Sequence, residues 1–184
     1  LKTVIIGSGV KSIGSYAFNG TRWLNNQPDG VVYIGKVLYI YKGDMPANTS
    51  ISVKEGTIGI ACSAFEKCSN LTSITIPNSV TNIGGFNWYP KVDYNDVFLG
   101  CNGLTTIISE IQNPFDLGST FRYVDSSVFS NATLYVPKGT VSVYQSKEGW
   151  NKFQKIVESS GGSSSTDVVV ENNVVYEIEG VTVA

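Results

Sequence analysis

The sequence predicts a β-rich solenoid, a stack of short coils that each add one strand to a narrow parallel sheet. The apolar residues of the segment that begins at Leu1 recur 70 residues later, at Leu71, Ile74, Ile76, Val80 and Ile83. A copy that lies 47 residues after the first includes Ile51, Val53, Ile60 and Phe65. The difference between the two offsets gives a repeat of 23 residues, which is a typical solenoid period.

Each unit opens with alternating apolar residues, a pattern that predicts a strand with one buried face. The alternating pairs are Val4 and Ile6, Ile51 and Val53, Ile74 and Ile76. Leu104 with Ile107 predicts one further rung, and Leu134 with Val136 predicts a closing rung. A second apolar pair in each unit, such as Val80 and Ile83, is expected across the coil.

Aromatic and sulfur-containing residues also keep the repeat. Phe18, Phe65, Phe98 and Phe129 share one position, which predicts a single continuous aromatic core. Cys68 and Cys101 each follow such a phenylalanine by three residues, and Cys62 is the third cysteine. Adjacent rungs lie about 4.8 Å apart, wider than the usual Cβ spacing of a disulfide. We therefore favour small, buried, reduced thiols over a Cys68–Cys101 disulfide.

Three segments interrupt the period. Residues 22–46 contain two apolar runs around Gly35 and Lys36, which predicts a β-hairpin with a two-residue turn. Residues 86–96 form an insertion rich in aromatic side chains, and residues 112–127 are irregular. Regular coils use their apolar residues for stacking, so binding is expected at an interruption, residues 86–96 first.

The repeat pattern ends after residue 136. Thr140 is a candidate helix cap, and Trp150, Phe153 and Ile156 recur at helical spacing, which predicts a short capping helix over the open end of the stack. The expected domain is therefore the solenoid with its cap, residues 1–158. Residues 159–166 have the composition of a flexible Ser/Gly linker. Residues 167–184 have a hairpin pattern, as a tail or as the start of a truncated further domain.

The repeat has a familiar form. The run from Leu71 to Gly84, with Ala64, Phe65 and Cys68 just before it, closely resembles the BspA-like leucine-rich repeat family, type 5. The chain departs from the family pattern at Asn48, where a leucine is expected, and in its insertions. The resemblance implies a right-handed leucine-rich repeat stack, usually on exported, surface-attached proteins of Bacteroidetes. It also implies adhesion to host proteins or to other cells, and it carries no catalytic residues.

Composition and motifs argue against several function classes. The formal charge is −2, without a long basic run, which argues against nucleic-acid binding. The sequence has no histidine, which removes most triad, metal and general-base arrangements. A glycosidase needs two facing carboxylates, for which Asp93, Asp96 and Glu110 are the only plausible neighbours. We therefore expect that the chain is not an enzyme and that it binds no cofactor and no metal ion.

Aromatic residues in the insertions are the candidate binding residues, because Trp and Tyr offer large rigid faces to proteins or sugars. They are Trp88, Tyr89 and Tyr94 in one insertion and Trp23, Tyr39 and Tyr41 in or beside the other. The alternative is that these rings pack their own loops against the stack. Exposed aromatic surface would favour binding, and buried rings would favour packing.

The sequence therefore favours a non-catalytic, extracellular or cell-surface recognition module that binds a host protein or another macromolecule. A structural spacer that presents a neighbouring domain is the first alternative. A carbohydrate-binding module that uses the aromatic insertions is the second. Attachment to the outer membrane would depend on segments outside this chain, and the C-terminal hairpin, residues 167–184, offers a route to self-association. The identity of the protein or glycan ligand stays open.

Overall fold

The structure, a computed structural model, describes residues 2–84, 96–117, 124 and 126–159. The aromatic residues Trp88, Tyr89 and Tyr94 lie outside the described residues, as do all but the first residue of the Ser/Gly linker and the whole C-terminal hairpin. The architecture below is therefore that of the repeat units, the inserted hairpin and the C-terminal cap.

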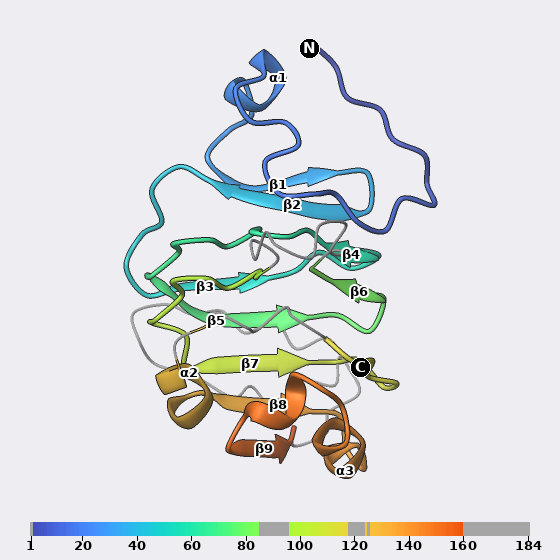
Figure 1. Cartoon of the computed structure of the whole chain (residues 1–184), viewed down its shortest axis with the longest axis vertical. Helices are drawn as coiled ribbons and strands as arrows, with labels where there is room; N and C mark the ends of the chain where they lie inside the picture. The colour runs from blue at the N-terminus through green and yellow to red at the C-terminus, as the bar shows by residue number, and fades with distance from the viewer. Residues whose placement is uncertain (1, 85–95, 118–123, 125, 160–184) are drawn as a thin grey trace, which may run out of the picture.

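A five-stranded parallel sheet forms one side of the molecule, with its strands following one another in chain order (Figure 1). The strands are β3 (Thr49–Ser52), β5 (Leu71–Ile76), β7 (Thr106–Ser109), β8 (Thr133–Val136) and β9 (Lys155–Glu158). One apolar residue of each strand is in register across the sheet, namely Ile51, Ile74, Ile107, Leu134 and Ile156. The predicted rungs are thus confirmed as parallel strands, with Val53 and Leu104 lying just outside β3 and β7.

The second sheet runs on the opposite side of the coils and has the order β1-β2-β4-β6. β1 (Gly30–Ile34) and β2 (Val37–Lys42) form the predicted antiparallel hairpin, with Ile34 opposite Val37 at the turn. β2 then pairs in parallel with β4 (Gly59–Ile60), and β4 pairs with β6 (Asn82–Ile83). The inserted hairpin therefore extends the ladder that the second apolar pairs were expected to form.

This placement of the hairpin changes the first repeat unit, whose predicted strand at Val4 and Ile6 is absent. Ile5 between them is 90% exposed, while Val4 and Ile6 pack on a small core beneath the hairpin. The repeat alignment gives Ile13 the place beside Ile60, but Leu38 of β2 occupies that place. Because a strand edge accepts one neighbour, the first unit is displaced from the ladder.

A register irregularity marks the departure from the repeat at the start of β3. The pairing between β3 and β5 shifts between Thr49 and Ser50. Asn48, which stands where a leucine was expected, has a φ of 58°. An asparagine tolerates this left-handed conformation better than a leucine does, so the unusual residue fits the local geometry.

Two separate cores replace the single aromatic core that the repeat predicted. Phe65 and Phe98 stack in the large core between the sheets, with ring centroids 5.8 Å apart and planes at 5°. Phe18 packs instead in the small core beneath the hairpin, edge-on to Trp23 and Tyr39. The prediction of one continuous spine is wrong because the hairpin separates the first unit from the others.

The fourth phenylalanine of the predicted spine, Phe129, lies at the margin of the large core. It belongs to α2 (Ser126–Asn131), whose buried residue is Val128. Phe129 is partly buried and meets Phe153 edge-on at 5.2 Å. Its side chain therefore links α2 to the C-terminal cap rather than extending the Phe65–Phe98 stack.

The C-terminal cap combines α3 (Val141–Gln145), a 3-10 turn (Trp150–Lys152) and strand β9. Tyr144 and Trp150 are both fully buried and meet edge-on at 5.3 Å. The Tyr144 hydroxyl donates to the Ile111 carbonyl at 2.7 Å and lies 2.6 Å from the Ser109 hydroxyl, while Trp150 Nε1 donates to the Phe115 carbonyl at 3.0 Å. These bonds join the cap to the loop after β7.

The predicted helical segment is wrong in its last part. Ile156 and Val157 belong to β9, which pairs in parallel with β8 through Leu134 and Ile156. An open strand edge at β8 would leave a row of backbone groups without partners, and β9 satisfies them. The helical spacing of Trp150, Phe153 and Ile156 arises because the first two lie in a turn and the third faces inward from a strand.

We expect Phe65→Ala to lower the free energy of unfolding by about 3–5 kcal/mol, because the side chain is fully buried. Phe129→Ala is the matched comparison, and its smaller loss follows from its partly buried position. Both values would come from denaturant melts. A loss below about 1 kcal/mol for Phe65→Ala would contradict the stacked core.

The three cysteines are buried and free, as the repeat predicted. Burial raises the pKa of Cys68 to about 11, and burial also raises the pKa of Cys62 and of Cys101. We expect slow labelling by a thiol reagent in the native state and rapid labelling of all three after denaturation without reductant. Because the folded thiols hold their protons, stability should fall as pH rises above the ordinary thiol pKa of about 8.5. If only one thiol reacts after denaturation without reductant, the other two form a disulfide.

Candidate interaction surface

The outer face of the five-stranded sheet is a regular surface that the repeats build. Strand residues alternate between the two faces, so the neighbours of the inward row point outward. One outward row consists of Ser50, Ser73, Thr106, Thr133 and Lys155. The other consists of Ser52, Thr75, Ile108, Tyr135 and Val157. The face is thus polar near β3 and becomes apolar toward β9.

The apolar end of this face consists of Ile108, Tyr135 and Val157, which we name the outer apolar row. Tyr135 is 36% exposed and Val157 38% exposed, and Ile108 is half-buried between its neighbours. Adjacent strands lie about 4.8 Å apart, so three side chains in register form one continuous strip. Lys155 of β9 belongs to the other outward row, and its exposed side chain gives the strip a charged neighbour.

Threonine hydroxyl groups fasten the coils together at the edge of this face. Thr72 Oγ1 donates to the Thr49 carbonyl at 3.1 Å, and Thr105 Oγ1 donates to the Thr72 carbonyl at 3.2 Å. On the opposite ladder, Thr81 Oγ1 donates to the Ile58 carbonyl at 3.3 Å. Each bond joins two neighbouring units, and we name the set the threonine ladder.

The aromatic residues of the hairpin region mostly pack inward. Tyr39 is 2% exposed, and its hydroxyl accepts a hydrogen bond from Phe18 N at 3.0 Å. Burial raises the pKa of Tyr39. Trp23 is half-buried, with its ring centroid 5.5 Å from that of Phe18. Tyr39 therefore offers no ring to a partner, in contrast to the expectation from its place in the hairpin, and Trp23 offers only part of one.

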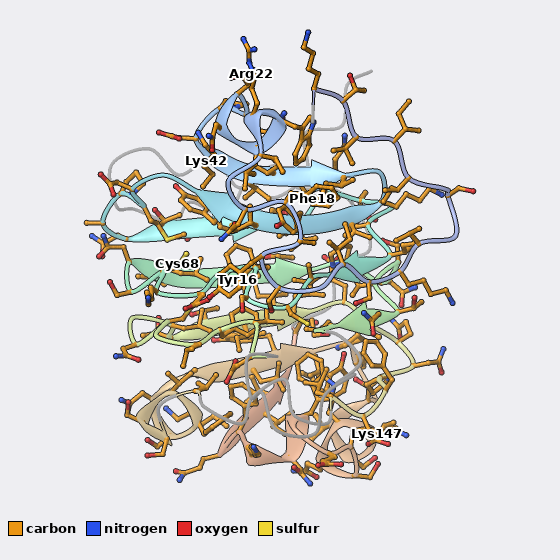
Figure 2. All side chains as sticks on the ribbon, turned by 45° about the horizontal axis from the view of Figure 1, so that its top comes forward. Tyr16, Phe18, Arg22, Lys42, Cys68 and Lys147 are labelled. Carbon is orange, nitrogen blue, oxygen red and sulfur yellow. The ribbon has the colours of Figure 1, made fainter. Side chains whose placement is uncertain are left out.

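Tyr41 is the hairpin residue that borders a concave surface. A groove of about 430 Å³ lies between the β2–β3 connection and the β4–β5 connection, and we name it the hairpin groove. It is lined by Tyr41, Gly43, Asp44, Met45, Glu66, Lys67, Cys68, Ser69 and Asn70. Figure 2 shows Cys68 on the same side of the molecule as Tyr16, below Lys42 of the hairpin.

Backbone and side-chain bonds fix both walls of the hairpin groove. Tyr41 N donates to the Ala64 carbonyl at 2.7 Å, and Asn70 Nδ2 donates to the Met45 carbonyl at 2.8 Å. The Glu66 carboxylate accepts a hydrogen bond from the Tyr16 hydroxyl, and its other oxygen lies 3.7 Å from Lys67 Nζ. The groove is therefore a preformed, largely polar hollow at the junction of the insertion and the repeat.

The carboxylates considered for hydrolysis have other surroundings. Asp96 is buried, and its Oδ1 accepts a hydrogen bond from Phe98 N at 3.0 Å, a bond that fixes the local turn. Glu110 is exposed; partial burial and the nearby Glu55 carboxylate raise its pKa. Asp93 lies outside the described residues. Within the described part of the chain, no three His, Cys, Asp or Glu side chains gather as metal ligands would.

A comparison with known protein families agrees with the repeat geometry. The chain belongs to the family described as the BspA type leucine-rich repeat region, whose model matches residues 1–110 and 39–139 in 6 copies. Such repeats are typically non-catalytic and indicate a protein-interaction module. No curated protein and no solved structure gives a significant match to the chain. Among the described residues, none of the helices has the length and apolar character to span a membrane.

The outer apolar row has a signal in the sequence. Ile108, Tyr135 and Val157 each follow an inward rung residue by one position, so the register alone puts them on the outer face. The hairpin groove had no such signal. It arises where two segments 20 or more residues apart, around Met45 and Asn70, meet through a hydrogen bond.

Lys67 on the groove rim has a backbone φ of 62°, whereas the equivalent positions of two other units are Gly20 and Gly100, with φ of 70° and 79°. A side chain in this region costs about 1–2 kcal/mol. Glycine removes that strain but loses more entropy on folding, so Lys67→Gly should raise the free energy of unfolding by up to about 1 kcal/mol.

Gly100→Ala is the opposite change and should lower stability. A Cβ there would lie 3.2 Å from Lys67 Cα and would have to adopt the left-handed conformation. Denaturant melts of both variants check the pair. A marked loss of stability in Lys67→Gly would mean that the lysine side chain outweighs its backbone strain.

Proposed function

We propose that the chain is a non-catalytic recognition module that binds a protein partner through the outer face of the five-stranded sheet. The observation that carries the proposal is the outer apolar row, in which Tyr135 and Val157 are both more than one-third exposed on adjacent strands. Regular coils need apolar residues inside the stack. Apolar residues that point outward in register serve no stacking purpose.

The physical character of the row suits a protein interface. Tyrosine supplies a large rigid contact with a polar tip, and such residues often dominate the binding energy of an interface. The row lies on β7, β8 and β9, which pair in one parallel sheet, so a partner would have little backbone to order on binding. Lys155 provides an exposed charged group beside the row, and polar groups of this kind surround the apolar centre of many interfaces.

The finer parts of the proposal rest on the family resemblance. The family is typical of surface or extracellular proteins, and we propose that this chain acts there in adhesion to a host protein or another macromolecule. In this proposal residues 1–158 form one right-handed repeat stack with its cap. Residues 159–166 link it to residues 167–184. A module that binds nothing would instead act as a spacer, which is the alternative that the experiment below separates.

We expect Tyr135→Ala to weaken binding to a protein partner by about 2 kcal/mol or more, the range of a central interface residue. Val157→Ser should act in the same direction with a smaller effect. The measurement is surface plasmon resonance of the full chain against a panel of purified extracellular-matrix proteins. Ser52→Ala, in the same outward row at the β3 end, is the matched control and should leave the affinity unchanged.

Three outcomes separate the alternatives in this experiment. Binding that Tyr135→Ala weakens and Ser52→Ala does not supports the sheet face. Equal binding by all variants moves the site elsewhere, with the aromatic insertion at residues 86–96 as the next segment to delete. Absence of binding to every protein in the panel favours the spacer. Circular dichroism of each variant checks that the fold is intact.

A further inference from the structure

We propose that the hairpin groove binds a neutral saccharide. The groove lies at the end of the hairpin and is lined by residues of the β2–β3 and β4–β5 connections, whereas the outer apolar row lies on strands β7, β8 and β9. The two sites share no residue. The groove can therefore be tested independently of the protein-recognition function proposed above.

The size and lining of the groove favour a small polar ligand. Its volume of about 430 Å³ lies within the range of ordinary small-molecule sites. Most such sites are lined mainly by apolar side chains, whereas here Tyr41 and Met45 are accompanied by carboxylate, amide, hydroxyl and ammonium groups. A pyranose ring matches this mixture because it carries hydroxyl groups around its rim and C–H groups on its faces.

Particular atoms are available to recognise hydroxyl groups. The Asp44 and Ser69 side chains line the groove and are exposed, and neither makes a hydrogen bond within the described part of the chain. A carboxylate accepts hydrogen bonds from two hydroxyls, and a serine hydroxyl both donates and accepts. Tyr41 lines the groove while packing partly on the large core, and the exposed part of this side chain is the surface on which a sugar face can rest.

The charges around the groove favour a neutral sugar over an acidic one. Asp44 and Glu66 are carboxylates, and Lys67 is the cation among the lining residues. Glu66 is already engaged by the Tyr16 hydroxyl and lies 3.7 Å from Lys67 Nζ. Asp44 is then the carboxylate most able to meet a ligand, and it would repel a uronic or sialic acid.

The backbone at the groove rim supports a binding role. Lys67 keeps a left-handed conformation at a position where two other units have glycine. Unfavourable backbone conformations of this kind cluster at functional sites, where the surrounding structure holds them in place. Lys67 Nζ beside the Glu66 carboxylate presents a donor at the rim that glycine would lack.

The test is an NMR titration of the uniformly 15N-labelled full chain with glucose, galactose, mannose and N-acetylglucosamine, and with N-acetylneuraminic acid as the anionic probe. We expect one or more neutral sugars to shift the amide resonances around Asp44 and Ser69 with a Kd on the order of 1 mM, usual for so small a ligand. Asp44→Ala and Ser69→Ala should each weaken that binding about tenfold or more, because each removes a group that would hydrogen-bond to the sugar. The fold should stay intact, since no described contact uses either side chain.

Tyr135→Ala is the matched control, since it alters the outer apolar row and should leave the sugar affinity unchanged. Conversely, Asp44→Ala should leave any protein binding unchanged, so the two proposals can fail separately. The saccharide proposal is overturned by any of three results: no shifts with the neutral sugars at tens of times the expected Kd, shifts confined to residues outside the groove, or tighter binding of N-acetylneuraminic acid than of every neutral sugar.

Discussion

The alignment of one inward residue per coil is the constraint on which the rest of the structure depends. Ile51, Ile74, Ile107, Leu134 and Ile156 stand in register across five parallel strands, and each is buried or half-buried. A side-chain period of two means that this alignment also fixes every outward residue. The threonine ladder, the stacked Phe65–Phe98 pair and the outer apolar row are all consequences of that one register.

The inserted hairpin shows how such a stack tolerates a large interruption. β2 pairs with β4 through Val37 and Leu38, so the hairpin satisfies the backbone groups that a displaced first unit leaves open. The cost is a second small core, in which Phe18, Trp23 and Tyr39 pack together. The gain is a concave junction, because the end of β2 must turn away from the repeat at Gly43, whose φ is 81°. An interruption of the period thus creates a concave surface where the insertion meets the repeat.

The sequence predicted the features that depend on the repeat and missed those that depend on long-range pairing. The rungs, the hairpin with its turn and the buried cysteines follow from local pattern and period, and the structure has them. The loss of the first strand could not be predicted, because it results from competition between Leu38 and Ile13 for one place beside Ile60. Strand β9 was missed because Phe153 and Ile156 are three residues apart, a spacing that a turn followed by a strand also produces.

The two candidate surfaces differ in how many of their side chains can be substituted without loss of the fold. Tyr135 and Val157 occupy positions where any strand-forming residue satisfies the register, so their side chains can vary without loss of the stack. The hairpin groove is less free, because the Tyr41 backbone N–H and the Asn70 side-chain amide donate hydrogen bonds that hold its walls together. Asp44 and Ser69 are the exceptions within it, since the described structure does not need their side chains. A repeat protein can thus place adaptable recognition on its sheet and a more constrained small-ligand site at a junction between an insertion and the repeat.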